Sequence, residues 1–272
     1  MGSNFGKYDV PPTLQRLIDL QNVLGDSEKF YLGLNFYLSL ENFRYFNTPS
    51  DVVVFGNIGL DGVHYGFLTD FGTVTDLEVA PIVCVSPMNF DRPTRIVANN
   101  LCEFLRINLT DGELFYNQFD SEESYLVAKN QWIAETDQPS GYEKLVRERA
   151  TKFLNENIRI PIIENPYRYV QKVDVERQRI ISIKTQDGLG VTTPLLQGEK
   201  HIPFPIHKDT EPNLDWLQEY LYSAPIASRH AVLRDIQLNY ILQENQKLNK
   251  TVIDAMINIK LIDEASRLSE YI

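Results

Sequence analysis

The pattern of hydrophobic and polar positions is clearest between residues 51 and 109, where it predicts a small sheet. Three short apolar runs end near Gly, Asp, Asn or Pro: Val52–Phe55, Val63–Leu68 and Pro81–Val85. The second run alternates, with Val63, Tyr65 and Phe67 on one face of an extended chain. Short runs of β-branched and aromatic residues with such boundaries are typical of antiparallel strands joined by tight turns. We therefore expect these runs to form one antiparallel meander.

The apolar period changes after the third run and predicts a helix. From Ile96 to Leu105 the apolar residues recur at spacings of three and four, as on the buried face of a helix. Asn99 or Asn100 can cap its start. This helix should lie across the sheet. We expect one buried cluster between the two, made of Phe55, Phe67, Val83, Phe104 and Leu105.

The rest of the chain adds helices on both sides of this segment and two further strands. Helical spacing predicts helices at residues 13–24, 122–136, 142–157, 214–222, 226–242 and 248–268. Apolar, β-branched runs predict strands at Tyr167–Val175 and Arg179–Lys184. Because a Pro-Ser-Gly turn separates residues 122–136 from residues 142–157, we expect those two helices to form a hairpin.

These elements predict an α+β fold, with a central antiparallel β-sheet, helices packed on one face and a helical C-terminal extension. The prolines after residue 160 and the change of period there suggest a boundary. We place an α+β domain at residues 1–160. Residues 161–272 should form a β-hairpin followed by the helical extension.

Charge and composition narrow the class of partner. The chain has 272 residues and a formal net charge of −11. Such an acidic balance argues against binding to nucleic acid, whose phosphates require a basic footprint. No apolar run reaches membrane-spanning length, and the start of the sequence shows no secretory pattern. We expect a cytoplasmic protein with a protein partner, and no binding to nucleic acid or membrane.

No stretch of the sequence carries a recognisable catalytic or metal-binding motif. Asp70-Phe71-Gly72 spells the metal-binding triplet of protein kinases, but the other kinase motifs are missing. His201 and His207 flank a proline-rich segment at a spacing that fits no standard metal pattern. We therefore predict no metal, no organic cofactor and no enzymatic activity. One alternative remains, a hydrolase in which His64 acts as a general base beside a carboxylate.

The segment from residue 55 to residue 105 resembles the SUKH superfamily, which includes bacterial toxin-immunity proteins and fungal regulators of cell-wall synthesis. The matching pieces are Phe55-Gly56, the turn and strand from Gly62 to Asp70, the Pro81–Val85 strand, and Val97-Ala98 with Phe104-Leu105. The resemblance covers about a fifth of the chain well and about half loosely. It implies that the domain at residues 1–160 is SUKH-like.

The resemblance also implies a function, that of a non-enzymatic binding protein that neutralises a cognate, basic toxin by covering it. A regulatory or scaffold protein of the cell-wall-regulator type is the alternative. Acidic residues in the loops of the predicted sheet can meet a basic surface and speed encounter. The candidate partner-binding residues are Asp61, His64, Asp76, Glu78 and Asp91.

Overall fold

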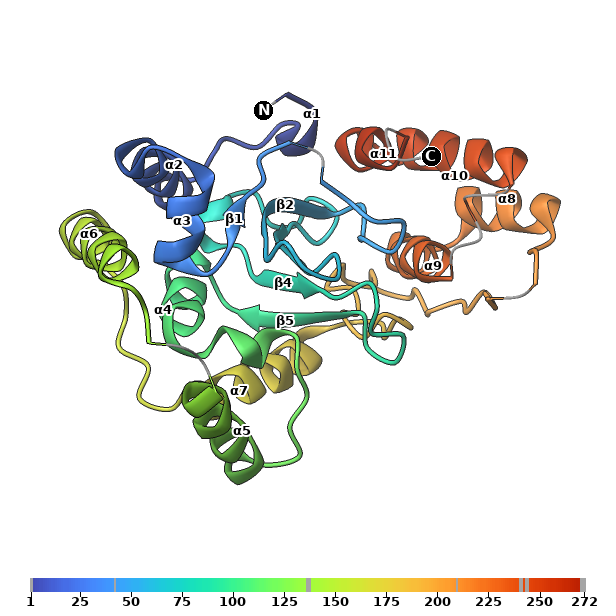
Figure 1. Cartoon of the computed structure of the whole chain (residues 1–272). Helices are drawn as coiled ribbons and strands as arrows, with labels where there is room; N and C mark the ends of the chain where they lie inside the picture. Colours follow the sequence, from blue (N-terminus) through green and yellow to red (C-terminus); the bar gives the residue numbers. More distant parts are fainter. Residues whose placement is uncertain are drawn as a thin grey trace.

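A five-stranded antiparallel sheet lies at the centre of the molecule, with the strands adjacent in chain order (Figure 1). The computed structural model describes residues 2–41, 43–135, 138–208, 210–239, 242 and 245–269. The strands are β1 (Tyr37–Leu38), β2 (Val52–Asn57), β3 (His64–Leu68), β4 (Ile82–Val85) and β5 (Thr94–Ala98). The meander predicted from the three apolar runs is confirmed as β2, β3 and β4.

Strand β3 shows the predicted alternation. Tyr65 and Phe67 are fully buried in the larger core, whereas Leu68 belongs to a second cluster on the other face. Gly56, the glycine of the Phe-Gly pair near the end of β2, is packed closely against an aromatic ring. A Cβ at position 56 would lie 2.7 Å from the ring of Phe36, a separation that side chains do not tolerate, so only glycine fits against this ring.

The helix that follows the sheet starts later than its spacing suggested. Residues Thr94–Ala98 pair with β4 as strand β5, so the prediction of helical structure from Ile96 is wrong. β-branched residues dominate this stretch and favour an extended chain. Helix α4 (Leu101–Asp111) begins after Asn100, whose side chain accepts a hydrogen bond of 2.9 Å from the amide of Glu103. The predicted asparagine cap is confirmed.

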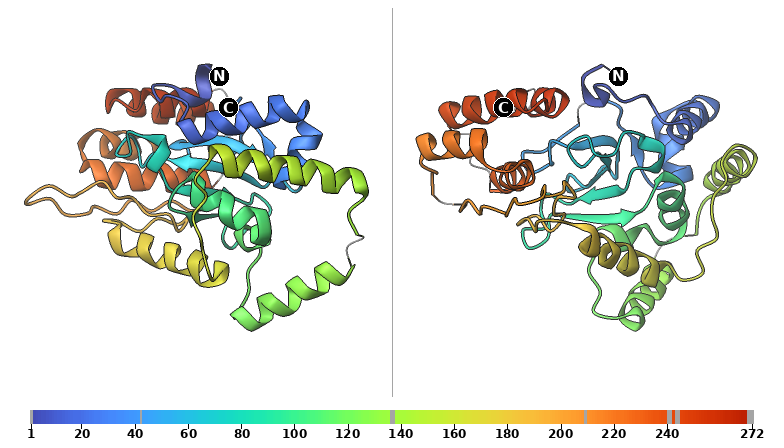
Figure 2. Two further views of the ribbon diagram at one scale, coloured as in Figure 1. Left: turned by 90° about the vertical axis from the view of Figure 1, so that its left-hand side faces the viewer. Right: turned by 180° about the vertical axis from the view of Figure 1, so that it is seen from behind.

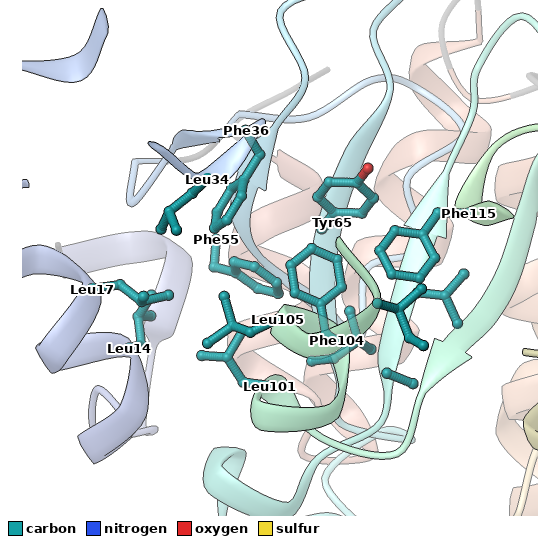
Figure 3. Close-up of a cluster of buried hydrophobic side chains, with 14 of the residues drawn as sticks. Leu14, Leu17, Leu34, Phe36, Phe55, Tyr65, Leu101, Phe104, Leu105 and Phe115 are labelled. Atoms are coloured by element: carbon teal, nitrogen blue, oxygen red, sulfur yellow. The ribbon is translucent and has the colours of Figure 1, made fainter. Parts of the chain in front are cut away.

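One face of the sheet is covered by α4 and by three more helices: α2 (Pro12–Leu24), α3 (Ser27–Leu34) and α6 (Gly141–Asn157). Their apolar residues meet those of the strands in the larger core (Figure 3). Phe104 of α4 lies at its centre, with its ring centroid 4.7 Å from Tyr65 and 5.5 Å from Phe55. Val83 does not join this cluster as expected. It faces the opposite side of the sheet.

The opposite face is covered by helix α7 (Pro166–Ile180), which packs on β5. The predicted strands at residues 167–175 and 179–184 are therefore wrong, and with them the β-hairpin. Asn165 caps this helix and Pro166 occupies its first turn, and both features favour a helix start. Its valines suggested a strand, yet Val170 and Val173 lie three apart on its buried face. Beyond it, Ile183 and Val191 form a single antiparallel bridge.

Helices α5 (Glu122–Glu135) and α6 form at the predicted positions but do not pair as a hairpin. Helix α6 packs against α3 and α2, whereas α5 contacts α7. Figure 2 shows that the two helices do not lie side by side. Tyr125 is the one fully buried apolar residue of α5, so this helix lacks the continuous apolar face that a hairpin would need.

The C-terminal part contains the predicted helical extension, on the opposite side of the molecule from α2, α3 and α6 (Figures 1 and 2). Its helices are α8 (Leu214–Ser223), α9 (Ile226–Leu238), α10 (Gln246–Asn258) and α11 (Ile262–Ser269). The predicted single helix at residues 248–268 is divided at Lys260, which has a positive φ of 69°. The α+β fold with C-terminal helices is confirmed.

Three short elements complete the described chain: α1 (Gly2–Phe5) and the 3₁₀ turns η1 (Leu77–Val79) and η2 (Gly112–Phe115). Helix α1 packs on α11, so the first and the last described helices are in contact. Among the described helices, none combines the length and apolarity needed to cross a bilayer.

Candidate partner-binding site

Two loops at one end of the sheet enclose a surface groove of about 510 Å³. One is the β2–β3 turn at residues 58–63, and the other is the β4–β5 loop at residues 86–93. The successive connections of an antiparallel meander alternate between the two ends of the sheet. The β2–β3 turn and the β4–β5 loop therefore lie at the same end. We call this the acidic groove, and its lining includes Asp61, Val63, Met88, Phe90, Asp91 and Tyr116.

The acidic groove combines exposed apolar side chains with carboxylates. Met88 is 66% exposed and Phe90 is 69% exposed. Leu60 in the neighbouring turn is 64% exposed. Several large apolar side chains exposed together usually mark a place where another molecule binds.

Asp61 and Asp91 are both exposed and border these apolar side chains. Neither forms an ion pair with any described residue. One cation approaches the same surface: the Nζ of Lys208 lies 5.7 Å from the centroid of the Phe90 ring. The structure thus brings together two of the predicted partner-binding residues.

Asp76 and Glu78 lie elsewhere, in the β3–β4 connection at the opposite end of β3. The Glu78 carboxylate accepts hydrogen bonds from the amide of Thr13, at 3.0 Å, and from the Thr13 hydroxyl. Asp76 accepts a hydrogen bond of 2.9 Å from the amide of Glu78. Both side chains therefore support local structure, and the five candidate residues do not form a single surface.

His64 is fully buried and has no access to a substrate. Its Nδ1 lies 2.7 Å from the carbonyl oxygen of Gly62 and its Nε2 lies 3.0 Å from the hydroxyl of Thr48. Burial lowers the pKa of His64 to about 4, so the ring stays neutral at pH 7. Both nitrogens are occupied, and no carboxylate of the described residues bonds to them. His64 therefore has neither the position nor the partner of a general base.

A buried cluster of charges escaped the sequence analysis. Arg234 of α9 is fully buried and contacts Asp51 at 2.6 Å, Asp187 at 3.2 Å and Asp70 at 3.7 Å. Arg177 of α7 forms a bidentate pair with Asp70, at 2.6 and 2.7 Å. Burial raises the pKa of the Asp51 carboxyl to about 6, although Arg234 opposes this shift.

This buried charge cluster joins segments from both sides of the predicted boundary at residue 160. Arg267 of α11 adds a further link by donating to the carbonyl of Ser50 at 2.7 Å. No local signal in the sequence connects these residues, because Arg234 and Asp51 are 183 positions apart. The cluster has no exposed member and is structural in character.

The described residues include no group of three or more His, Cys, Asp or Glu side chains placed to hold a metal ion. The absence of a metal and of an organic cofactor stays a prediction. Comparisons of the chain with protein-family models and with curated proteins found no match.

Proposed function

We propose that the chain is a non-enzymatic binding protein that recognises a basic protein partner through the acidic groove. One observation carries this proposal, namely that Met88 and Phe90 are exposed beside two carboxylates, Asp61 and Asp91, that form no ion pair with a described residue. The resemblance of residues 55–105 to the SUKH superfamily supports a more specific role, in which the chain neutralises a cognate toxin by covering it.

The groove has the arrangement expected of a protein interface. Apolar side chains at the centre lose contact with water on binding, while charges at the rim remain partly solvated. The rim charges of Asp61 and Asp91 would attract a basic surface over a range of about 8–10 Å at physiological salt. Such steering raises the association rate more than it lowers the dissociation rate.

The test uses the product of the gene adjacent to that of this protein, since an immunity protein is expected beside its toxin. Binding is measured by surface plasmon resonance at two salt concentrations. Reversing Asp61 and Asp91 together to Lys should lower the association rate about tenfold or more at low salt. The matched control reverses Asp9 and Asp254, two exposed aspartates outside the groove.

A second variant, Phe90→Ala, should raise the dissociation rate because it removes buried apolar area from the centre of the interface. Binding that ignores salt, both charge reversals and the loss of Phe90 would contradict the proposal. An equal effect of the groove reversal and of the control would show that net charge alone attracts the partner.

A further inference from the structure

A small polar cavity of about 90 Å³ lies next to the acidic groove and shares Tyr116 with it. We call it the tyrosine pocket, and its lining includes Asn35, Tyr65, Asn108, Gly112, Glu113 and Tyr116. A water molecule needs about 10–15 Å³ of such volume. The pocket can therefore take several waters or the polar end of one long side chain.

Tyr65 contributes an unusual group to this pocket. Its ring is fully buried in the aromatic core, and its hydroxyl points away from the rings of Phe55, Phe104 and Phe115 (Figure 3). The hydroxyl is itself buried and forms no hydrogen bond with a described residue. A buried hydroxyl without a partner is costly, and a phenylalanine would fill the same space in the core.

Asn108 and Glu113 offer hydrogen-bond acceptors to the pocket. The Asn108 amide nitrogen donates to the carbonyl of Leu34, which leaves Oδ1 as the atom available to the pocket. This oxygen faces Gly112, at 3.2 Å from where a Cβ would stand. Glu113 is half-buried, and its carboxylate forms no hydrogen bond or ion pair with a described residue. The carboxylate and the amide oxygen favour a ligand that carries hydrogen-bond donors and a positive charge.

Two helices end at the pocket and add negative potential. Asn35 is the C-terminal cap of α3, and Asn108 lies in the last turn of α4. The C-terminus of a helix carries a partial negative charge and favours a cation. The guanidinium of Arg95, in β5, donates hydrogen bonds to the carbonyl groups of residues 114, 115 and 117.

We propose that the tyrosine pocket binds the cationic end of one lysine or arginine side chain of the protein partner. The Tyr65 hydroxyl, Asn108 Oδ1 and the Glu113 carboxylate accept its N–H groups, while the stem of the side chain runs along Tyr116 from the groove. This inference rests on the proposed function for the source of the side chain. The binding chemistry belongs to the pocket alone and is testable without the partner.

The direct test uses three small probes and NMR of the full-length, ¹⁵N-labelled protein at constant ionic strength. N-acetyl-lysine methylamide and N-acetyl-arginine methylamide carry the cation, and N-acetyl-norleucine methylamide carries the stem alone. At least one cationic probe should bind in the millimolar range, about tenfold more tightly than the norleucine probe. The shifted amide signals should be those of Asn35, Asn108, Gly112 and Glu113.

Two variants locate the bound cation. Tyr65→Phe removes only the unpartnered hydroxyl, and Glu113→Gln removes only the charge. Each should weaken the cationic probe by about fivefold or more, whereas Glu176→Gln on α7 should not change it. Gly112→Ala narrows the pocket without backbone strain, since φ at this position is −57°, and it should also weaken binding.

Thermal melting of Tyr65→Phe without a probe gives a second readout. If the hydroxyl is kept for a ligand, the variant should melt at the same temperature as the wild type or higher, because an unsatisfied buried group has been removed. A lower melting temperature would show that the hydroxyl has a structural partner, and would overturn the proposal. Equal binding of the norleucine probe, or no binding at about 50 mM, would also overturn it.

The outcomes separate the pocket from the function proposed above. Cation binding by the pocket together with a partner that ignores the Asp61 and Asp91 reversal would retain this inference and reject the acidic groove. A partner that depends on the groove, combined with a pocket that binds no probe, would reject this inference alone.

Discussion

The two ends of the β2–β3 hairpin place the same residue type in opposite surroundings. At one end, Asp51 and Asp70 are buried against arginines from α7 and α9. At the other end, Asp61 is exposed beside the equally exposed Asp91, and the neighbouring side chains are apolar. Composition counts these aspartates alike, yet one pair holds the chain together and the other faces solvent.

Three arginines of the C-terminal part bond to the buried end of the hairpin. Arg177, Arg234 and Arg267 are all buried, and all bond to groups at the Asp51–Asp70 end of the hairpin or to α1. A buried carboxylate is tolerated only when a cation and hydrogen bonds compensate for its lost hydration. The exposed carboxylates of the acidic groove form no ion pair with a described residue, which is why we propose that they meet a partner.

The largest predicted effect comes from disrupting the buried charge cluster at the Asp51–Asp70 end of the hairpin. Arg234→Leu should cost about 3–5 kcal/mol of unfolding free energy, because it leaves Asp51 and Asp187 buried without their cation. Urea denaturation followed by circular dichroism measures this loss. Lys172→Leu is the control, since its side chain is 71% exposed and pairs with Glu176 at 3.5 Å. It should change stability by less than about 1 kcal/mol.

If Arg234→Leu proved as stable as the wild type, the buried charges would not hold the C-terminal helices to the sheet. Residues 161–272 would then be expected to fold independently, and limited proteolysis near residue 160 would release two resistant fragments. A single cooperative transition that shifts as a whole is the result expected from the observed contacts.

The second prediction compares two phenylalanines with opposite exposure. Phe104 is fully buried and Phe90 is 69% exposed. Phe104→Ala should cost about 3–5 kcal/mol through the cavity it leaves under α4. Phe90→Ala should stay within about 0.5 kcal/mol of the wild type in the same denaturant titration. Equal losses would mean that the apolar side chains of the groove are part of the core.

The sequence supported the prediction of elements that have a clear period. Alternation identified β3, and Asn100 marked the start of α4. The prediction failed at α7, where the β propensity of the valines suggested a strand although the three-residue spacing of Val170 and Val173 and the cap at Asn165 fit a helix. Local β propensity is overridden here because the helix buries its valines against β5.

The candidate site was predictable only in part, for a related reason. Asp61 and Asp91 come from different turns but share one end of the sheet, which the meander already implied. The sequence did not reveal that Glu78 bonds to Thr13, because that contact spans 65 positions. The tyrosine pocket depends on two helix ends meeting beside Tyr65, and no residue spacing encodes such a meeting.

The third prediction concerns pH and the buried imidazole at the hairpin. His64 has a folded-state pKa of about 4, below the ordinary value of about 6.5. The unfolded chain therefore takes up a proton below pH 6.5 that the folded protein does not bind. Stability from this group is complete above pH 6.5 and is lost as pH falls to 4, by about 3 kcal/mol.

Urea titrations of the wild type and His64→Gln at several pH values isolate this contribution. The difference in slope is the quantity of interest, because Asp51 shifts in the opposite direction and is present in both proteins. The variant should lose less stability between pH 6.5 and 4. Parallel curves would show that His64 is protonated in the folded state, and hence that it lies nearer to water than its burial indicates.

The smallest predicted effect tests whether Glu78 has a structural role or is an exposed charge like those of the acidic groove. Helix α2 starts after Pro11, whose side chain cannot cap it, and the Glu78 carboxylate accepts from the Thr13 amide at 3.0 Å. A carboxylate in this place acts as a cap supplied by another segment, and its charge interacts favourably with the positive end of the helix.

Glu78→Ala should therefore cost about 1 kcal/mol of unfolding free energy. Hydrogen exchange of the Thr13 amide should become faster at the same time. Asp91→Ala, at an exposed carboxylate of the groove, should change neither quantity. If Glu78→Ala behaved like Asp91→Ala, Glu78 would be a free surface charge, and it would return to the residues that can meet a basic partner.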